Sequence, residues 1–167
     1  MPPARPTDPH ADLRRFVDVL RADPLDWRSK GFGALGRPVA PAELAAAGVL
    51  LSDLGTPMLT LDAAAVAHNV AAMARWCDAR GLGLAPHGKT TMAPALWLAQ
   101  LDAGARAITV ANASQLRAGY AFGVRALVVA NEVVGAADLR WIAQTQDDDP
   151  DLEVLMAALY EAFCKDL

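Results

Sequence analysis

The chain has 167 residues, of which 54% are hydrophobic, so it is long enough to bury the core of one ordinary domain. Its net charge of -4 comes from 19 acidic and 15 basic residues spread along the sequence. This distribution excludes the basic patch that grips a phosphate backbone, and we expect no nucleic-acid partner.

The sequence indicates a globular protein of a reducing compartment. The first twelve residues are rich in proline and charge and lack the apolar region of a secretory signal. No later apolar stretch reaches the roughly 20 residues that cross a bilayer. Cys77 and Cys164 lie far apart and outside any C-x-x-C or His/Cys cluster, so neither a disulfide framework nor a metal site is predicted. We expect a cytoplasmic protein without a membrane partner.

Residues 1–54 are irregular, and we interpret them as an N-terminal extension. A helix is predicted over 13–21, before a stretch that contains Gly and Pro and an alanine-rich turn or helix. The string GFGALG at 31–36 has the G-x-G-x-x-G spacing of a dinucleotide-binding loop. Such a loop works only between a strand and a helix, where pyrophosphate meets the helix N-terminus. Because neither flanks the string here, we interpret it as a flexible loop.

From residue 55 onward, short apolar runs alternate with helical patterns. A strand is predicted over 58–61, followed by a helix with Asp62 as its N-cap that ends at Gly81. The run 82–85 is a candidate buried strand. The next helix begins at Thr91 or Pro94, with Thr91 as a candidate cap, and continues to about residue 102.

The remaining pattern repeats a strand followed by a helix. Strands are predicted over 107–111, 126–130 and 152–156, and helices over 114–122 and 135–144. The tripeptide V-A-N closes two successive strands, at Asn112 and at Asn131. Strands without alternation, each followed by a helix, indicate a parallel sheet covered by helices. The predicted fold class is α/β.

Lys89 is the lysine with an informative position. Of the three lysines, it alone follows an apolar strand. Active sites of parallel α/β structures lie at the carboxyl ends of the strands, and partial desolvation there disfavours the ammonium form of a lysine. The neutral amine can then attack an aldehyde and form a Schiff base. On position alone, a lysine that extends its ammonium group to solvent is the alternative.

The string PHGKTTMAP at 86–94 resembles the lysine motif of the D-serine dehydratase and D-threonine aldolase group. These are fold-type III, alanine-racemase-like enzymes, and the bacterial amino-acid deaminases among them are the most similar. The resemblance extends over roughly 56–154, through TPM at 56–58, ITVA at 108–111 and VANEVVG at 129–135. It implies that Lys89 ends the first strand of a TIM-like (β/α)8 barrel and holds pyridoxal 5'-phosphate.

The same resemblance sets an expected domain organisation. Residues 55–156 would be the N-terminal part of the barrel, with about four strands, because a complete barrel takes about 250 residues. Residues 157–167 read as an atypical helical tail where the resemblance implies continued barrel. The C-terminal β-domain of this class is absent from the sequence, so we expect an N-terminal fragment.

Four further residues could contact the cofactor. His87 could orient the cofactor ring or Lys89, although a histidine at a strand end is also a common structural hydrogen-bonder. Thr90 could contact cofactor or substrate. Asn112 and Asn131 follow their strands at the end where active sites lie, although asparagine is also a common turn residue. No metal ligands are predicted.

The resemblance implies a lyase that converts D-serine or D-threonine to a 2-oxo acid and ammonia. The Thr-Thr-Met continuation after Lys89 is more similar to the deaminases than to the aldolases. A D-threonine aldolase, an amino-acid racemase, a non-catalytic pyridoxal-phosphate-binding protein and an inert half-barrel are the alternatives. The implied partners are a small D-amino acid and, in the full-length protein, a second copy in a homodimer.

Overall fold

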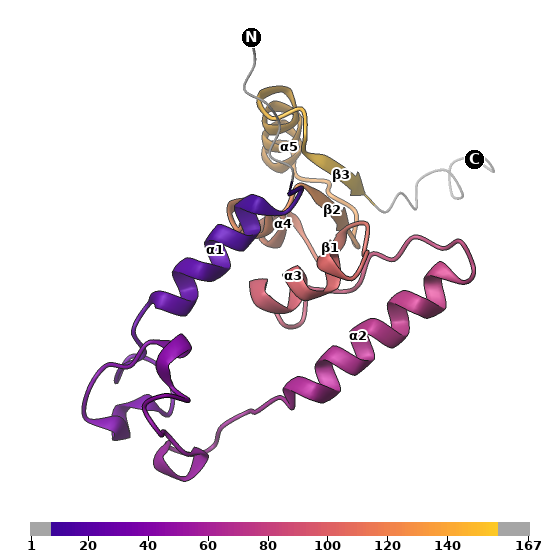
Figure 1. Ribbon diagram of the computed structural model, residues 1–167. Helices are drawn as coiled ribbons and strands as arrows, with labels where there is room; N and C mark the ends of the chain where they lie inside the picture. The colour runs from indigo at the N-terminus through magenta and orange to yellow at the C-terminus, as the bar shows by residue number, and fades with distance from the viewer. Residues whose placement is uncertain (1–7, 157–167) are drawn as a thin grey trace, which may run out of the picture.

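A computed structural model describes residues 8–156, which form five α-helices and three β-strands (Figure 1). The helices are α1 (Ala11–Ala22), α2 (Ala63–Asp78), α3 (Pro94–Asp102), α4 (Ala113–Ala121) and α5 (Ala136–Asp148). The strands are β1 (Ile108–Val110), β2 (Ala126–Val129) and β3 (Glu153–Met156). The predicted helical tail at 157–167 lies outside the described residues. Within the described part, no helix is both long enough and apolar enough to span a membrane.

The three strands form one parallel sheet in the order β1-β2-β3, with α4 and α5 as the connections. The register aligns Thr109 with Val128 and Val128 with Leu155. Consecutive parallel strands joined by helices are the repeated unit that the sequence predicted, so the α/β prediction is confirmed. The number of barrel strands stays a prediction.

Local sequence signals account for where the helices of this unit begin. The Asp62 carboxylate accepts a hydrogen bond from the amide of Ala65 (2.9 Å) and caps α2 as expected. Pro94 occupies the first turn of α3, where its missing N–H leaves no bond unmade. Asn112 caps α4 by accepting a hydrogen bond from the amide of Gln115 (3.0 Å).

The core lies between one face of the sheet and the helices that cover it. Alternate strand residues point into this layer and are buried, and they pack against buried side chains from α3, α4 and α5. The sheet contributes Ile108, Val110, Leu127 and Val129, and the three helices contribute Trp97, Leu116 and Ile142. Trp97 is the largest fully buried side chain, so it fixes how α3 sits on the sheet.

Helix α1 belongs to the same core. Its buried residues Leu13 and Val17 are members of the core cluster, and Phe16 packs on Phe122 with 4.9 Å between the ring centroids. A Cβ on Gly123 would lie 2.5 Å from the backbone nitrogen of Leu13, so only glycine permits this approach. The N-terminal segment therefore packs on residues more than one hundred positions away.

Charged pairs hold the outer side of α1. The Arg14 guanidinium donates hydrogen bonds to Asp8 (2.8 Å) and to Asp102 at the end of α3 (2.8 Å). Arg125 contacts Asp12 (3.2 Å) and Asp149 (2.8 Å). These side chains are partly solvated, so each pair stabilises the fold by little, and the set mainly orients α1.

The pair of Arg14 and Asp8 predicts a dependence of stability on pH. The hydrogen bond from Arg14 holds the pKa of Asp8 below its ordinary value. A lowered carboxyl pKa stabilises the folded state above the ordinary value of about 4, and this contribution is lost as the pH falls. We therefore expect Asp8→Asn to flatten the acid side of the thermal unfolding midpoint between about pH 5 and pH 2, measured by circular dichroism. Equal acid slopes in the two proteins would contradict this role.

Two of the predicted strands differ in the structure. Residues 58–61 form no strand, and Leu59 and Leu61 are 89% and 61% exposed. The apolar pattern there is that of a strand, but no neighbouring strand among the described residues offers hydrogen bonds to it. Residues 82–85 are extended beside β1 without forming a regular strand, and Leu82 is 53% exposed. The prediction that 82–85 form a buried strand is therefore wrong.

Two side-chain predictions also need correction. Thr91 does not cap α3, since the N-cap is Ala93 and the Thr91 hydroxyl donates instead to the Gly88 carbonyl (3.4 Å). Trp76 was expected to seal α2 against the sheet, but it is half exposed and stacks under the Arg80 guanidinium. Helix α2 packs only on α3, so its outer aromatic residue has no surface to cover.

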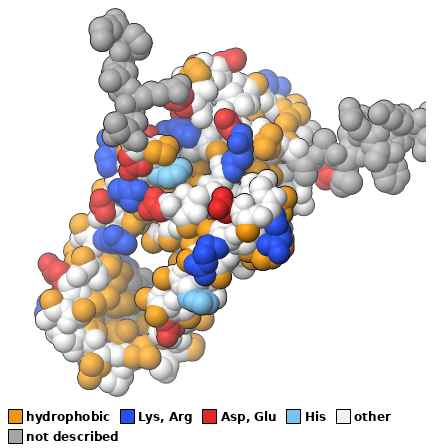
Figure 2. Space-filling view, turned by 45° about the vertical axis from the view of Figure 1, so that its right-hand side comes forward, with side chains coloured by type: hydrophobic (Ala, Val, Ile, Leu, Met, Phe, Trp, Pro, Cys, Tyr) orange, Lys and Arg blue, Asp and Glu red, His pale blue; other side chains and the backbone are white. Residues whose placement is uncertain are grey.

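Hydrophobic side chains are exposed on the segment between α1 and α2. Figure 2 shows them gathered at the lower left of the view, over this segment. Among them, Trp27 and Leu50 are largely exposed. The GFGALG string lies here as a short 3-10 helix, Phe32–Leu35, between Gly31 and Gly36 in left-handed conformations. No strand leads into it, as the sequence interpretation required.

Candidate functional site

The carboxyl edge of the sheet brings the predicted site residues together. Residues 84–88 run parallel to β1, with a single bridge between His87 and Thr109. Lys89 follows this bridge by two residues on its own segment, and Asn112 follows it by three residues beyond β1. Asn131 comes two residues after the end of β2. All three residues therefore lie at the edge where parallel α/β proteins place their active sites.

Lys89 sits on a tight turn that closes immediately after the extended segment. The amide of Met92 donates to the Gly88 carbonyl (2.9 Å), and the amides of Gly88 and Lys89 both donate to the Thr109 carbonyl of β1 (2.8 and 3.2 Å). Met92 has a positive φ of 44°. A left-handed non-glycine residue carries strain, which persists only where the surroundings fix the backbone. The turn is therefore tightly determined.

Gly88 allows this turn to rest on the core. A Cβ at this position would lie 2.4 Å from Nε1 of Trp97 and 2.6 Å from Cγ2 of Ile108. Both of those side chains are fully buried, so neither has room to move. Nε1 of Trp97 has no hydrogen-bond partner within residues 8–156. The indole therefore supports the Lys89 turn by packing.

Gln115 holds the same turn from the side. Its Nε2 donates to the Lys89 carbonyl (3.0 Å), and its Oε1 accepts from the amide of Ala111 (2.8 Å). One half-buried side chain thus joins the Lys89 turn to the end of β1 and to the first turn of α4. The sequence carried a signal for part of this arrangement, because Asn112-x-x-Gln115 has the spacing of a capping box. Gln115 was nonetheless missed as a site residue.

The two asparagines are each engaged through one half of the carboxamide. Asn112 uses its oxygen to cap α4, and Asn131 donates from Nδ2 to the carbonyl of Ala111 (2.8 Å). Their remaining polar atoms, Nδ2 of Asn112 and Oδ1 of Asn131, have no partner within the described residues. Both side chains are exposed. They combine a structural bond with a polar group that is free to contact a ligand.

His87 and Thr90 flank Lys89 and are exposed, whereas Lys89 itself is half-buried. Among residues 8–156, the Lys89 ammonium makes neither a hydrogen bond nor an ion pair. An unpaired primary amine on a rigid turn is the group that an aldehyde cofactor needs. This end of the chain therefore fits pyridoxal phosphate through its attachment lysine. Lys89 would hold the aldehyde carbon, while the free amide groups of Asn112 and Asn131 lie at the same edge.

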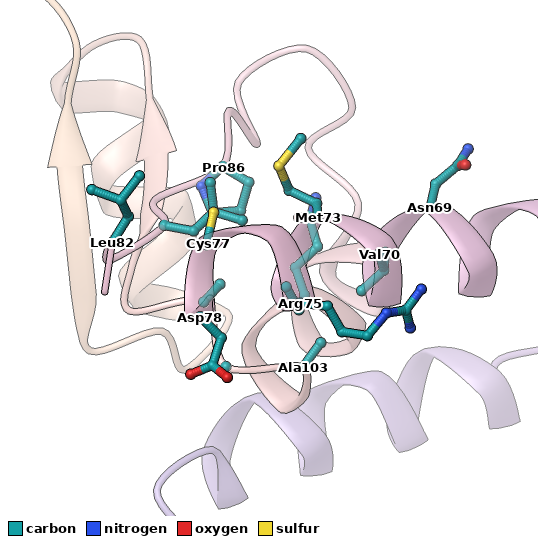
Figure 3. A pocket seen from close by; sticks show the side chains of 14 residues that line it. Asn69, Val70, Met73, Arg75, Cys77, Asp78, Leu82, Pro86 and Ala103 are labelled. Carbon is teal, nitrogen blue, oxygen red and sulfur yellow. The ribbon is translucent and has the colours of Figure 1, made fainter. Parts of the chain in front are cut away.

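The largest cavity among the described residues lies elsewhere. It has a volume of about 660 Å³ and is enclosed by α2, α3 and the start of the segment beside β1. Figure 3 shows Val70, Met73 and Cys77 along α2, with Leu82 and Pro86 on the neighbouring segment. The lining is mainly apolar and borders the amino-terminal ends of the strands. It is a gap beneath a loosely packed helix, at the end of the sheet opposite Lys89.

No cluster of three metal-ligating side chains occurs in the part of the chain that the structure describes. The titratable groups with displaced pKa values also lie away from Lys89. Burial and a hydrogen bond to Asp149 raise the pKa of Tyr120, which belongs to α4 on the outer layer. The site as described is thus an amine surrounded by amides, hydroxyls and an imidazole.

Comparison with known proteins gives two informative similarities. The chain is 37% identical over 94 residues to a D-threonine aldolase from Arthrobacter sp., which covers 56% of this chain and 25% of that protein. The crystal structure of D-threonine aldolase from Filomicrobium marinum superposes with a TM-score of 0.56 at 31% identity, over 64% of this chain and 27% of that one. The chain thus spans about a quarter of the length of these relatives.

A variant of D-threo-3-hydroxyaspartate dehydratase gives a weaker superposition, with a TM-score of 0.47 and 28% identity over 54% of this chain. No family model matches the chain. By sequence and by fold, the chain is therefore similar to part of a D-threonine aldolase. This similarity agrees with the expected enzyme group at the level of D-amino-acid lyases.

Proposed function

We propose that this chain supplies the lysine-bearing part of a pyridoxal-phosphate-dependent lyase for D-amino acids, with Lys89 as the attachment residue. One observation carries the proposal. Lys89 is an unpaired, half-buried amine on a fixed turn at the carboxyl edge of the parallel sheet, in a chain that is 37% identical to a D-threonine aldolase over 94 residues. The whole reaction requires residues beyond the quarter of those relatives that this chain spans.

The residues of the site have complementary roles in this proposal. Pyridoxal phosphate, when bound, withdraws electrons from the α-carbon of an amino acid and makes its bonds easier to break. Lys89 attaches the cofactor, and its amine, once displaced by substrate, can accept a proton from that carbon. Asn112 and Asn131 offer amide groups that orient a polar ligand, and His87 is an exposed group that can exchange protons with it.

Two reactions start from this arrangement. Removal of the β-hydroxyl of D-serine or D-threonine, with release of ammonia and a 2-oxo acid, is our first candidate, because the motif after Lys89 reads Thr-Thr-Met. Cleavage of the bond between the α- and β-carbons of D-threonine, which yields glycine and acetaldehyde, is the second. The printed names of the two D-threonine aldolases favour it. Racemisation and non-catalytic cofactor binding need no β-hydroxyl and are distinguished by their products.

Reductive trapping tests the proposal on the 167-residue chain. The protein is mixed with pyridoxal phosphate, reduced with borohydride and digested, and the labelled lysine is located by mass spectrometry. We expect label at Lys89 in clear excess over Lys30 and Lys165. Equal label on the three lysines, or none on Lys89, would overturn the proposal. Ammonia and 2-oxo acid from D-threonine would then support dehydration, and glycine would support the aldol cleavage.

A further inference from the structure

We infer that Gln115 is a positioning residue for Lys89, beyond its place in the first turn of α4. The inference rests on the proposed role of Lys89 as the attachment lysine. It starts from the two hydrogen bonds of one side chain. Gln115 accepts from the amide of Ala111, at the end of β1, and donates to the carbonyl of Lys89 itself.

The bond to Lys89 has no part in capping the helix. Asn112 already accepts the hydrogen bond from the Gln115 amide, so α4 is capped without the Gln115 side chain. In a capping box, the side chain three residues after the cap turns back to the backbone of the cap residue. Here it extends further, to Ala111 and to a segment 26 residues earlier in the chain. The side chain therefore bridges two segments.

The second observation is that the Lys89 turn needs a support on this side. Below it, Gly88 rests on Trp97 and Ile108, and behind it the backbone is tied to Thr109. These contacts fix Gly88 and leave the Lys89 carbonyl, which Gln115 holds. The left-handed backbone of Met92 follows directly and has to be maintained against its own strain. A single side-chain hydrogen bond of this kind contributes about 1 kcal/mol, which corresponds to about a fivefold change in the population of the held turn.

Glutamate separates the two possible roles of this side chain. Glu is the preferred residue of a capping box and suits a helix N-terminus electrostatically, so Gln115→Glu keeps α4 intact and still accepts from Ala111. An ionised carboxylate cannot donate to the Lys89 carbonyl, and the two oxygens repel each other. Gln115→Met removes both bonds at similar volume. Gln144→Glu, at an exposed position of α5, is the matched control.

The first readout is amide hydrogen exchange in the full chain without cofactor. For Gln115→Glu we expect protection of the Met92 amide, which closes the Lys89 turn, to fall about fivefold while the Ala111 amide stays protected. For Gln115→Met we expect both amides to lose protection. Wild-type protection of Met92 in Gln115→Glu would overturn the inference, because it would leave Gln115 a role in capping only.

The second readout is the partition of the trapped label between Lys89 and Lys30 after addition of pyridoxal phosphate. We expect both Gln115 variants to lower this ratio about fivefold, and Gln144→Glu to leave it unchanged. An unchanged ratio in Gln115→Glu would overturn the positioning role. Should the wild-type chain show no preference for Lys89, the proposed function fails, and the positioning of Lys89 for that cofactor fails with it. The exchange data would still decide whether Gln115 holds the turn.

Discussion

Replacement of Lys89 by arginine is expected to abolish the preferential label after treatment with pyridoxal phosphate and borohydride. Arginine keeps the positive charge and the long side chain, but its guanidinium stays protonated and cannot attack an aldehyde. The remaining label should be distributed between Lys30 and Lys165, at less than about a tenth of the wild-type yield. The measurement is peptide mass spectrometry of the reduced chain.

Lys30→Arg is the matched control for this experiment. Lys30 is exposed and lies in the segment between α1 and α2, away from the sheet edge. The control should retain the label on Lys89. Thermal unfolding should be almost identical in the two variants and the wild type, because Lys89 makes no side-chain hydrogen bond or ion pair within residues 8–156. A Lys89→Arg chain that still took up wild-type amounts of label would refute the assignment.

Gly88→Ala is expected to cause a large loss of stability and to displace the Lys89 turn. The new methyl group would lie 2.4 Å from Nε1 and 2.5 Å from Cε2 of Trp97, and 2.6 Å from Ile108. Overpacking of a closed core costs about 1–3 kcal/mol, and the upper end applies here because both neighbours are fully buried. The free energy of unfolding from urea titration measures the loss. The label on Lys89 should fall in parallel.

Gly83→Ala provides the control on the same segment. A Cβ there would meet only the Cδ atom of Arg106, at 3.7 Å, which is an ordinary contact with a flexible side chain. Removing a glycine at such a position changes stability by less than about 1 kcal/mol, and often favourably. Similar losses for the two variants would show that the segment tolerates no side chain at all, and that the contact with Trp97 is not the cause.

The sequence was sufficient where the signal is local. Asp62 and Asn112 precede apolar helical patterns, and both cap the helices that follow. The strands at 108–110, 126–129 and 153–156 have continuous apolar runs bounded by helices, so their type and their parallel pairing could be inferred. Residues 58–61 carry a similar pattern, yet form no strand, because pairing depends on a neighbour that the pattern does not specify.

The site required information from distant parts of the chain. Lys89 could be selected from its place after an apolar run, and its role as attachment residue stays a prediction. Gln115 reaches Lys89 across 26 residues, and Trp97 supports Gly88 from another helix. A capping-box pattern predicts where the Gln115 side chain begins and not where it ends. The left-handed Met92 is likewise a product of the closed turn and has no sequence signal of its own.

The docking of α1 also determines the order in which the chain can fold during synthesis. Asp12 pairs with Arg125 across 113 residues, and Arg14 pairs with Asp102 across 88 residues. At the speed of a ribosome, roughly ten seconds pass between the appearance of α1 and that of its last partner. During this interval Leu13 and Val17, both buried in the finished fold, are exposed to solvent on the nascent chain. The first helix to leave the ribosome is thus among the last to find its place, and it offers a chaperone an apolar surface until then.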